Sequence, residues 1–541
     1  MVLVLMMITG CGSSTSDNGG DNTDSDTEET TTEASNDSGQ EEDSLDDGSG
    51  TSGGAHNYLI QTKMRTDNAD DEQYTTLYSG SYDLIYMTDE DKTQYPDLWK
   101  SLETYNESTE SGFLNTYEQY LDEAKDWYKE SGPDDYFSAY SDENHIFISR
   151  TDDSFLSFEA NLFSYAGGAH GSYSRIGYNY DVKTGQKLAL KDVITDITRL
   201  QEIVITKLKS DYPDAQLTST YEQAVPQYLT GEEDQECTWY MTPQGIDIYF
   251  GVYLIGSYAD GAQIAHILYN DNPELFYEGF HVQQGDYVEN FDAYGNYYTD
   301  INEDGKPDEL SFEFEYDQNY SIEKMGISIN GNKTTFETYG YNVYPILVHK
   351  GGNTYMYAGF SLDNDYYTTY AYRLAEDGVT QIAQYSGRIT GMIPDEDYES
   401  EWQTTWSKVF ATPEDMYLSD RMQLLSTYQG LAKLRIGDEG KLMIVDDFYY
   451  AQLYAGSGKL TALKDVKAAT LDPDTRQILS ENEVIPKGKQ LVIYGTNNKN
   501  YVDLKDDEGQ MFRVTLDSSD WPQTVGGENI EELFDGMLFA G

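Results

Sequence analysis

The segment from residue 12 to residue 55 most limits what this chain can fold into. It consists almost entirely of Gly, Ser, Thr, Asn, Asp and Glu, with eight Asp, five Glu, no Lys or Arg, and Leu45 as its one large apolar residue. Such a segment cannot bury enough apolar surface to offset the entropy lost on ordering, and its charges repel one another. We therefore expect a flexible acidic tether over residues 12–55, with the folded domains after it.

The first eleven residues form a short apolar run that ends in small residues before Cys11. The run is shorter than the ~20 residues that span a bilayer, and it is typical of a secretory signal segment. Ile8-Thr9-Gly10-Cys11 resembles a bacterial lipobox, which implies that Cys11 becomes the lipidated first residue of the mature protein. The predicted location is the extracytoplasmic face of the cell membrane, with the lipid anchor as the only membrane contact.

The chain is strongly acidic, because 97 Asp and Glu outnumber 34 Lys and Arg and give a formal net charge of −63. This balance excludes a nucleic-acid-binding protein, which needs a basic face, and docking on anionic lipid through polybasic patches. The only cysteines are Cys11 and Cys237, so a disulfide scaffold is excluded, and Cys237 is expected to be a small buried hydrophobe.

The length of 541 residues predicts several domains, because single hydrophobic cores stop growing near ~250–300 residues. The aromatic content of 14% provides side chains for sizeable cores. The expected parts are a lipoprotein signal segment at 1–11, the acidic tether at 12–55, an α+β envelope domain at 56–285, a mainly β domain at 286–450, and a small SH3-like β domain at 451–541.

The first of these domains mixes helical and strand periodicities. Apolar residues recur at helical spacing over 113–128 and again over 197–208, which predicts two amphipathic helices. Residues 176–182 and 246–254 alternate between apolar and polar side chains, which predicts half-buried strands. The predicted fold class is α+β, with an antiparallel sheet covered by helices.

Several spaced motifs in this domain carry a family resemblance. They are Tyr165-Ala166-Gly167-Gly168-Ala169-His170-Gly171, Tyr178-Asn179-Tyr180-Asp181, Leu190-Lys191-Asp192-Val193 and Tyr253-Leu254-Ile255-Gly256-Ser257-Tyr258-Ala259-Asp260-Gly261. This succession resembles the extracytoplasmic domain of lysozyme-sensing anti-sigma factors. It also resembles the accessory domain fused to some peptidoglycan deacetylases. The resemblance covers roughly residues 57–285.

The resemblance implies a cell-envelope binding or sensing domain, and some members of that family bind lysozyme. The sequence shows no transmembrane helix, no sigma-binding segment and no deacetylase domain, so only the envelope-facing part of that function carries over. We expect a lipid-anchored surface protein that recognises an envelope or host ligand and has no catalytic residues. Lysozyme and peptidoglycan are the candidate partners, because an acidic body accelerates encounters with a basic protein.

Two other interpretations of the whole chain stay open. One is an enzyme that acts on cell-wall glycan through two cleft carboxylates ~5–10 Å apart, since 97 acidic residues form many pairs. The other is a structural spacer without a ligand. His170 also has two interpretations, because a histidine beside three glycines fits a base or metal ligand as well as a loop residue hydrogen-bonded to backbone.

Residues 300–308 carry the sharpest site pattern in the chain. Side-chain oxygens at positions 1, 3, 5 and 9, a backbone carbonyl at position 7 and a glycine at position 6 suit a hard cation. The pattern predicts a structural calcium loop whose ligands are Asp300, Asn302, Asp304, Lys306 and Asp308. Position 12 is Ser311, where an EF-hand has Glu, so the loop resembles the calcium loops of integrin-propeller and dockerin-type repeats. The alternative is a solvated Asx-rich turn.

The remaining sequence reads as mainly β. Residues 310–390 are rich in Tyr, Thr, Ile and Gly with short alternating runs, which predicts antiparallel sheet. The spacing of Trp402, Trp406 and Phe410 predicts a helix that ends before Pro413. Residues 488–536 resemble, over a short stretch, the SH3-like β-barrel of bacterial envelope proteins, some of which bind peptidoglycan peptides.

Overall fold

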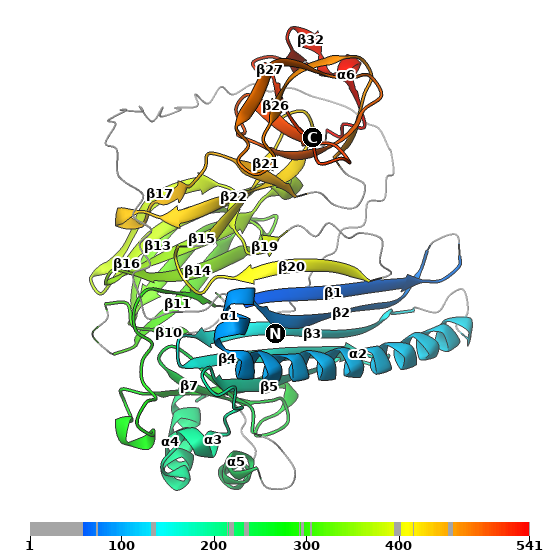
Figure 1. Ribbon diagram of the computed structural model, residues 1–541. Coiled ribbons are helices and arrows are strands. Elements are labelled where there is room, and N and C mark those ends of the chain that lie inside the picture. Colours follow the sequence, from blue (N-terminus) through cyan, green and yellow to red (C-terminus); the bar gives the residue numbers. More distant parts are fainter. Residues whose placement is uncertain are drawn as a thin grey trace. The chain divides into compact units, whose positions relative to one another are not determined.

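The computed structural model describes most of the chain after the predicted tether (Figure 1). Its described residues are 58–71, 74–130, 137–213, 215, 221–231, 237–291, 293, 297–302, 304, 306–393, 402–414, 416–452 and 458–539. All of them belong to one compact unit, Ser52–Gly541. Cys11 and the tether at 12–55 lie outside the described residues.

The first large sheet has seven strands, with neighbours in the order β19-β20-β1-β2-β3-β4-β5. All neighbours pair antiparallel except β2 and β3, which are parallel. The strands are β1 (Tyr58–Asn68), β2 (Thr76–Met87), β3 (Tyr140–Thr151), β4 (Phe155–Tyr165), β5 (Ser172–Asp181), β19 (Met392–Ile393) and β20 (Gln403–Val409).

The parallel pair is joined by a helical crossover, as parallel strands require. Helix α1 (Asp89–Gln94) begins after Thr88, whose hydroxyl accepts from the backbone N–H of Asp91, and α2 (Pro96–Glu130) follows it. The buried side chains of α2 include Phe113, Tyr117 and Leu121, so the helix predicted over 113–128 is confirmed. They pack against β2 and β3, and α2 runs along the sheet in Figure 1.

A smaller layer follows in the chain. It consists of α3 (Leu190–Val193), α4 (Ile197–Asp211), α5 (Tyr221–Thr230), a three-stranded sheet in the order β6-β7-β8, and the short η3 (Pro273–Leu275). The strands are β6 (Trp239–Met241), β7 (Gly245–Phe250) and β8 (Gln263–Leu268). The predicted helix over 197–208 is confirmed, and its Leu200, Val204 and Leu208 share one core with alternate residues of β7. The strand predicted to run to 254 is wrong beyond Phe250, where a turn begins.

Two antiparallel sheets form the next part and confirm the predicted sheet over 310–390. One has the order β10-β11-β12-β13 and the other β17-β16-β15-β14-β9, and their apolar side chains meet in a common core. The strands are β9 (Tyr287–Asn290), β10 (Tyr297–Thr299), β11 (Asp308–Tyr316), β12 (Ile322–Ile329), β13 (Asn332–Gly340), β14 (Val343–Lys350), β15 (Asn353–Ser361), β16 (Tyr367–Ala375) and β17 (Gly378–Ser386).

The C-terminal part is one twelve-stranded sheet, whose main path is β18-β21-β22-β24-β28-β29-β30-β26-β27. Its strands are β18 (Arg388–Ile389), β21 (Met416–Met422), β22 (Tyr428–Ile436), β23 (Leu442–Ile444), β24 (Tyr449–Gln452), β25 (Lys459–Ala462), β26 (Val466–Leu471), β27 (Ile478–Ile485), β28 (Gln490–Thr496), β29 (Tyr501–Lys505), β30 (Met511–Thr515) and β33 (Phe534–Asp535). Between β30 and β33 the chain forms three short elements: β31 (Thr524–Val525), β32 (Glu528–Asn529) and α6 (Ile530–Leu533). The pairings among the described strands form an open sheet, and the SH3-like barrel stays a prediction.

The helix predicted around Trp402 is wrong, because Gln403–Val409 is strand β20. A four-residue spacing of aromatic side chains satisfies both the helical period and the two-residue period of a strand. The edge of β1 decides between them, because β20 pairs with it from Tyr58↔Val409 to Met64↔Gln403. The predicted domain boundaries stay predictions, and this pairing joins residues on both sides of position 285.

No helix in the described ranges combines enough length with enough apolar side chains to cross a bilayer. Within the described residues the chain combines many antiparallel sheets with few helices, which agrees in part with the predicted α+β class followed by a mainly β region.

Candidate functional site

Two loops of the first domain meet through their aromatic side chains. Residues 166–171 connect β4 to β5, and residues 251–262 connect β7 to β8. The rings of His170 and Tyr258 are stacked, with centroids 5.0 Å apart and an interplanar angle of 26°. The ring of Tyr253 lies 5.7 Å from that of Tyr258. We call these three residues the aromatic cluster.

The aromatic cluster is open to solvent. His170 is exposed, and Tyr253 and Tyr258 retain 63% and 37% of their accessible surface. Aromatic side chains that remain exposed together are typical of interaction sites rather than of general protein surface. Two of the blocks that carried the family resemblance, 165–171 and 253–261, are thus neighbours in space.

Local hydrogen bonds and glycines hold both loops in shape. In the first loop, Gly167 and Gly168 have φ of +85° and +97°, a region that glycine occupies without a steric penalty. In the second, Asp260 accepts from the backbone N–H and the hydroxyl of Ser257 at 2.9 and 2.6 Å. The buried Gln263 donates to the carbonyl of Asp260 at 3.2 Å. The loops therefore present the aromatic cluster from fixed backbone.

The structure favours the interpretation of His170 as a loop residue that is hydrogen-bonded to backbone. Its Nδ1 lies 3.0 Å from the carbonyl oxygen of Gly171, to which it donates. No group of three or more His, Cys, Asp or Glu side chains in metal-binding arrangement occurs among the described residues. His170 therefore contributes a ring to the aromatic cluster.

A layer of charged side chains lies behind the hairpins that carry these loops. Glu159 on β4 is buried, and both of its carboxylate oxygens accept from Nη1 of Arg175 on β5, at 3.2 and 3.1 Å. The guanidinium of Arg175 in turn lies 5.0 Å from the ring centroid of Tyr249 on β7. Burial raises the pKa of Glu159, and the charge of Arg175 opposes that rise.

A second pair extends this layer across β7 and β8. Asp247 and His266 are cross-strand partners in the β7–β8 register, and Oδ1 of Asp247 lies 2.8 Å from Nδ1 of His266. Burial lowers the pKa of His266, but the carboxylate of Asp247 outweighs that effect, and the net direction is upward. The ring of Tyr298 lies 5.0 Å from that of His266 and completes the layer.

Sequence reasoning missed this charged layer. The available signal was in β7, where Ile246, Ile248 and Phe250 face one core and Asp247 and Tyr249 alternate with them. Polar residues between buried apolar ones normally face solvent. Here Asp247 and Tyr249 face β4 and β5. The two sheets pack closely beside them, since a Cβ at Gly177 of β5 would come within 1.9 Å of the carbonyl oxygen of Trp239 of β6.

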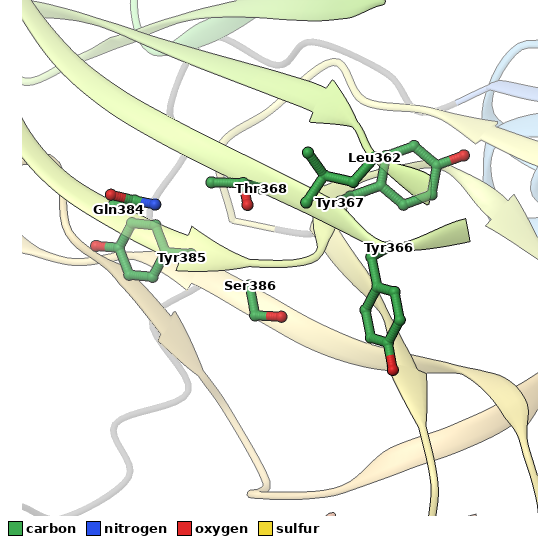
Figure 2. Close-up of a pocket in the computed structure, with 7 residues that line it drawn as sticks. All are labelled: Leu362, Tyr366, Tyr367, Thr368, Gln384, Tyr385 and Ser386. Atoms are coloured by element: carbon green, nitrogen blue, oxygen red, sulfur yellow. The ribbon is translucent and has the colours of Figure 1, made fainter. Parts of the chain in front are cut away.

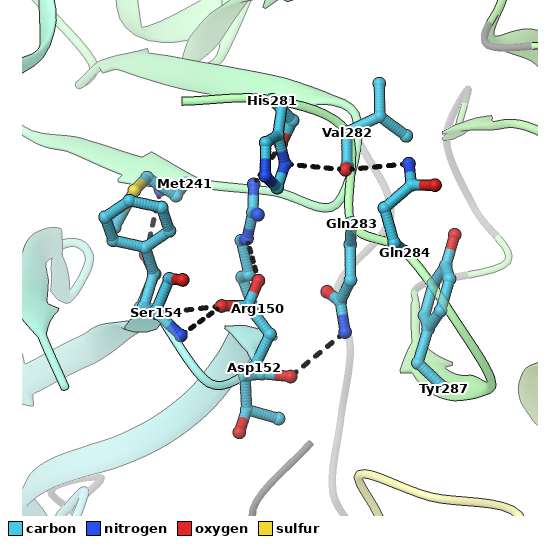
Figure 3. A network of polar contacts seen from close by, with 12 residues as sticks. Arg150, Asp152, Ser154, Met241, His281, Val282, Gln283, Gln284 and Tyr287 are labelled. Atoms are coloured by element: carbon cyan, nitrogen blue, oxygen red, sulfur yellow. Dashed lines mark hydrogen bonds and ion pairs between the residues drawn. The ribbon is translucent and has the colours of Figure 1, made fainter. Parts of the chain in front are cut away.

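A buried arginine, Arg150 at the end of β3, links the first sheet to the segment after β8 (Figure 3). The guanidinium of Arg150 donates from Nε to Asp152 at 2.7 Å and from Nη1 to the carbonyl of His281 at 2.9 Å. Oδ1 of Asp152 accepts from the backbone N–H groups of Ser154 and Phe155, both at 2.8 Å. This network ties the β3–β4 turn to the segment after β8, which is a structural role.

The predicted calcium ligands lie together in the β10–β11 turn. Side-chain oxygens of the turn accept hydrogen bonds from backbone N–H groups: those of Asp300 and Asn302 from Asp304 at 3.1 and 3.0 Å, and that of Asp304 from Lys306 at 2.8 Å. Oδ2 of the buried Asp308 accepts from the N–H of Ile301 at 3.1 Å. Residues 303 and 305 lie outside the described set. Oδ1 of Asp308 accepts from Nδ2 of Asn330 at 2.6 Å, so both of its oxygens already accept hydrogen bonds. The described bonds are those of the Asx-turn alternative, and the calcium loop stays a prediction.

A buried acid–base pair supports this turn from below. Oε1 of Glu289 lies 2.6 Å from Nε2 of His349, and it also accepts from the hydroxyl of Thr299 at 2.7 Å. The hydroxyl of Thr354 donates to the carbonyl of Ile301 at 2.9 Å. These buried hydrogen bonds therefore hold Thr299 and Ile301, at the start of the turn, in place. An open cavity of about 290 Å³ lies beside it, lined by Asn302, Arg373 and Glu376 among others.

The Asp247–His266 pair generates a pH prediction. Because the pKa of His266 is raised in the folded state, the stability that the pair contributes is fully present below ~6.5, the ordinary pKa of histidine. That stability is lost as the pH rises through the higher folded-state pKa. We expect the free energy of unfolding, measured with urea from pH 6 to pH 9, to fall less steeply in His266→Asn than in the natural chain.

The matched control is His281→Asn, because Nδ1 of His281 donates to the backbone carbonyl of Val282 at 2.9 Å. It should keep the slope of the natural chain. Equal slopes for the natural chain and His266→Asn would contradict the prediction.

Comparison with known proteins gives a family match for part of the chain. The family described as "Protein of unknown function (DUF3298)" matches residues 190–270. No curated protein matches the sequence. Similar solved structures include a member of the DUF3298 family from Bacteroides fragilis, with 20% identity and a TM-score of 0.32, and a DUF3298 family protein from Pseudomonas aeruginosa, with 15% identity and a TM-score of 0.29.

Each of these two structures is similar over 42% of this chain and 96% of its own chain. The matched residues 190–270 contain α4, α5 and the β7–β8 pair. They also contain Asp247, His266 and both tyrosines of the aromatic cluster. The part of the chain that resembles the DUF3298 family is therefore the part that supplies most of the candidate site.

Proposed function

We propose that the protein is a lipid-anchored cell-surface binding or sensing protein that recognises an envelope or host ligand through the aromatic cluster. The observation that carries this proposal is the exposure of Tyr253 and Tyr258 on the β7–β8 loop, where the ring of Tyr258 stacks on His170 of the β4–β5 loop. Aromatic side chains dominate the binding energy of many interfaces, because they bury a large area with little loss of side-chain entropy. The family resemblance to lysozyme-sensing domains supports the same interpretation.

A cationic protein such as lysozyme is the partner that the charge favours, with peptidoglycan as the other candidate. The long helix α2 illustrates the charge, since its exposed residues include more acidic than basic side chains. The acidic ones are Asp97, Glu103, Glu107, Glu118, Asp122, Glu123, Asp126 and Glu130, and the basic ones are Lys100, Lys125 and Lys129. A surface of this sign attracts a basic partner over a range that salt shortens.

The alternative of a glycan-acting enzyme has one observation in its favour. Burial raises the pKa of the Glu159 carboxyl, as in a general acid, and Asp247 supplies a second carboxylate on a facing strand. However, Glu159 is bound to Arg175 and Asp247 is bound to His266. Because each carboxylate is already engaged by a basic side chain on the neighbouring strand, both are suited to a structural role, which supports binding over catalysis.

The lysozyme version of the proposal is tested with the full mature chain. We expect binding to hen lysozyme whose association rate falls at least tenfold between low and high salt, as for steered encounters. Tyr253→Ala combined with Tyr258→Ala should weaken the affinity by about tenfold or more. The control is Tyr277→Ala, because Tyr277 is 49% exposed in the same domain and lies outside the aromatic cluster.

Surface plasmon resonance at several salt concentrations measures both quantities. Binding that the double substitution leaves unchanged would exclude the aromatic cluster as its site. Absence of binding, or binding that is indifferent to salt, would remove the cationic-partner proposal. In that case immobilised peptidoglycan is the next probe for the aromatic cluster.

The proposed address rests on Cys11 and the acidic tether, which would hold the body away from the membrane surface. We expect the natural chain, expressed in a bacterium with its own leader, to fractionate with the membrane and to incorporate radiolabelled palmitate. Cys11→Ala should abolish both, while Cys237→Ala should change neither. The proposed anchor would be contradicted if the natural chain carried no label and were found in the soluble fraction.

We further propose that the β10–β11 turn binds calcium in a structural role, through Asp300, Asn302, Asp304, the carbonyl of Lys306 and Asp308. Calcium should raise the melting temperature of the natural chain, because a ligand that binds only the folded state stabilises it. Asp304→Asn should reduce that shift.

Asp317→Asn is the matched control for the calcium experiment, since Asp317 forms a comparable Asx turn between β11 and β12 and accepts from the N–H groups of Asn319 and Ser321. It should leave the calcium shift intact. A melting temperature that neither calcium nor EDTA changes would rule out the turn as a metal site.

A further inference from the structure

A second pocket lies in the mainly β part of the chain, away in sequence from the aromatic cluster. It has a volume of about 440 Å³ and is lined by Leu362, Tyr366, Tyr367, Thr368, Gln384, Tyr385 and Ser386. Its walls are the end of β17, the start of β16 and the loop before β16, which contains η4 (Asp363–Asp365). This volume falls within the ~300–1,000 Å³ of small-molecule sites.

The lining of this pocket is uncharged, in a chain with 97 acidic residues. Figure 2 shows the hydroxyl-bearing side chains of Thr368 and Ser386 between the ring of Tyr385 on one side and the rings of Tyr366 and Tyr367 on the other. Aromatic faces alternate here with hydroxyl and amide groups. The pocket thus offers flat apolar surface and neutral hydrogen-bonding groups together.

Hydrogen bonds outside the pocket fix two of the rings. The hydroxyl of Tyr385 accepts from the backbone N–H of Leu442 at 3.0 Å, and the hydroxyl of Tyr366 accepts from Nε2 of Gln423 at 2.6 Å. Rings held in this way need no reordering when a ligand binds, which lowers the entropic cost of association.

Guanidinium groups lie over two of the rings that line the pocket. Arg388 lies 4.4 Å from the ring centroid of Tyr367, and Arg421 lies 4.7 Å from that of Tyr366. These two cations occupy the positions over the rings that a cationic ligand would use. The nearby carboxylate of Asp420 accepts from Ser386 at 2.9 Å, so the flanking charges have both signs and favour a neutral ligand.

Two polar side chains of the lining are available to such a ligand. Within the described part of the chain, Thr368 and Gln384 make no side-chain hydrogen bond, and Gln384 is exposed. A primary amide both donates and accepts, and a hydroxyl does the same. Their natural complement is a molecule whose edges carry hydroxyl groups and whose faces carry C–H groups.

We propose that this pocket binds a neutral saccharide, with its sugar rings against the tyrosines and its hydroxyl groups on Gln384 and Thr368. A sugar ring presents C–H groups on its faces and hydroxyl groups at its edge, which matches the two kinds of surface that the pocket combines. The site is separate from the aromatic cluster, so this proposal does not depend on the proposed protein partner.

The test is isothermal titration of the full mature chain with four neutral oligosaccharides: chitotriose, cellotriose, xylotriose and maltotriose. We expect at least one to bind at micromolar to millimolar concentration. The double substitution Thr368→Val with Gln384→Ala should weaken that binding about tenfold, because each removes a hydrogen bond worth ~0.5–1.5 kcal/mol. Neither side chain has a described partner, so the variant should fold normally.

Gln381→Ala is the matched control, since Gln381 is exposed on the same strand and does not line the pocket. It should bind as the natural chain does. The proposal is overturned if none of the four oligosaccharides binds, or if the double variant binds as tightly as Gln381→Ala.

Discussion

The backbone pairing of β20 with β1 is the interaction on which the rest of the first sheet depends. A strand at a sheet edge exposes unpaired N–H and C=O groups, and β1 would be such an edge without its partner. The pairing also brings two tryptophans onto the sheet. The ring centroid of Trp402 lies 5.6 Å from that of Tyr82 and 5.9 Å from that of Phe113 on α2. The ring centroid of Trp406 lies 5.1 Å from that of Tyr86. A segment from far along the sequence therefore completes both the hydrogen bonding and the aromatic packing of the first strands (Figure 1).

The candidate site is built from hairpin ends that stand on this frame. Interior layers fix the hairpins, through Glu159 with Arg175 on one sheet and Asp247 with His266 on the other. Buried ion pairs of this kind do not add much stability, but removing one partner is strongly destabilising. Each pair therefore joins two neighbouring strands of its own sheet, and the contact of the Arg175 guanidinium with the ring of Tyr249 links the two sheets. In the tyrosine pocket, hydrogen bonds to Gln423 and Leu442 position two of the rings in a similar way.

Periodicity predicted the elements whose partners are local. The helices over 113–128 and 197–208 follow their own apolar stripes, and hairpins such as β16–β17 follow local alternation. It failed where a distant partner decides, as at Trp402, whose spacing fits a helix until β1 is taken into account. The charged layer was missed for the same reason, because an alternating strand shows that Asp247 lies opposite a core and not that a second sheet covers it. The spacing of polar residues placed a turn at 300–308, whose calcium binding stays a prediction, yet the Glu289–His349 pair beside that turn comes from two strands far apart in sequence. Contacts of this range leave no local pattern.

The late position of β20 in the chain has a consequence for how the protein is made. A chain synthesised from its N-terminus exposes β1 and β2 long before Val409 is made. During that interval the first sheet has an unprotected margin, and pairings of such long range form slowly. The same interval keeps β1 available to other extended chains, which is the route to misassembly. An acidic segment that precedes β1 repels copies of itself, and this repulsion would keep neighbouring nascent chains apart until the sheet is closed.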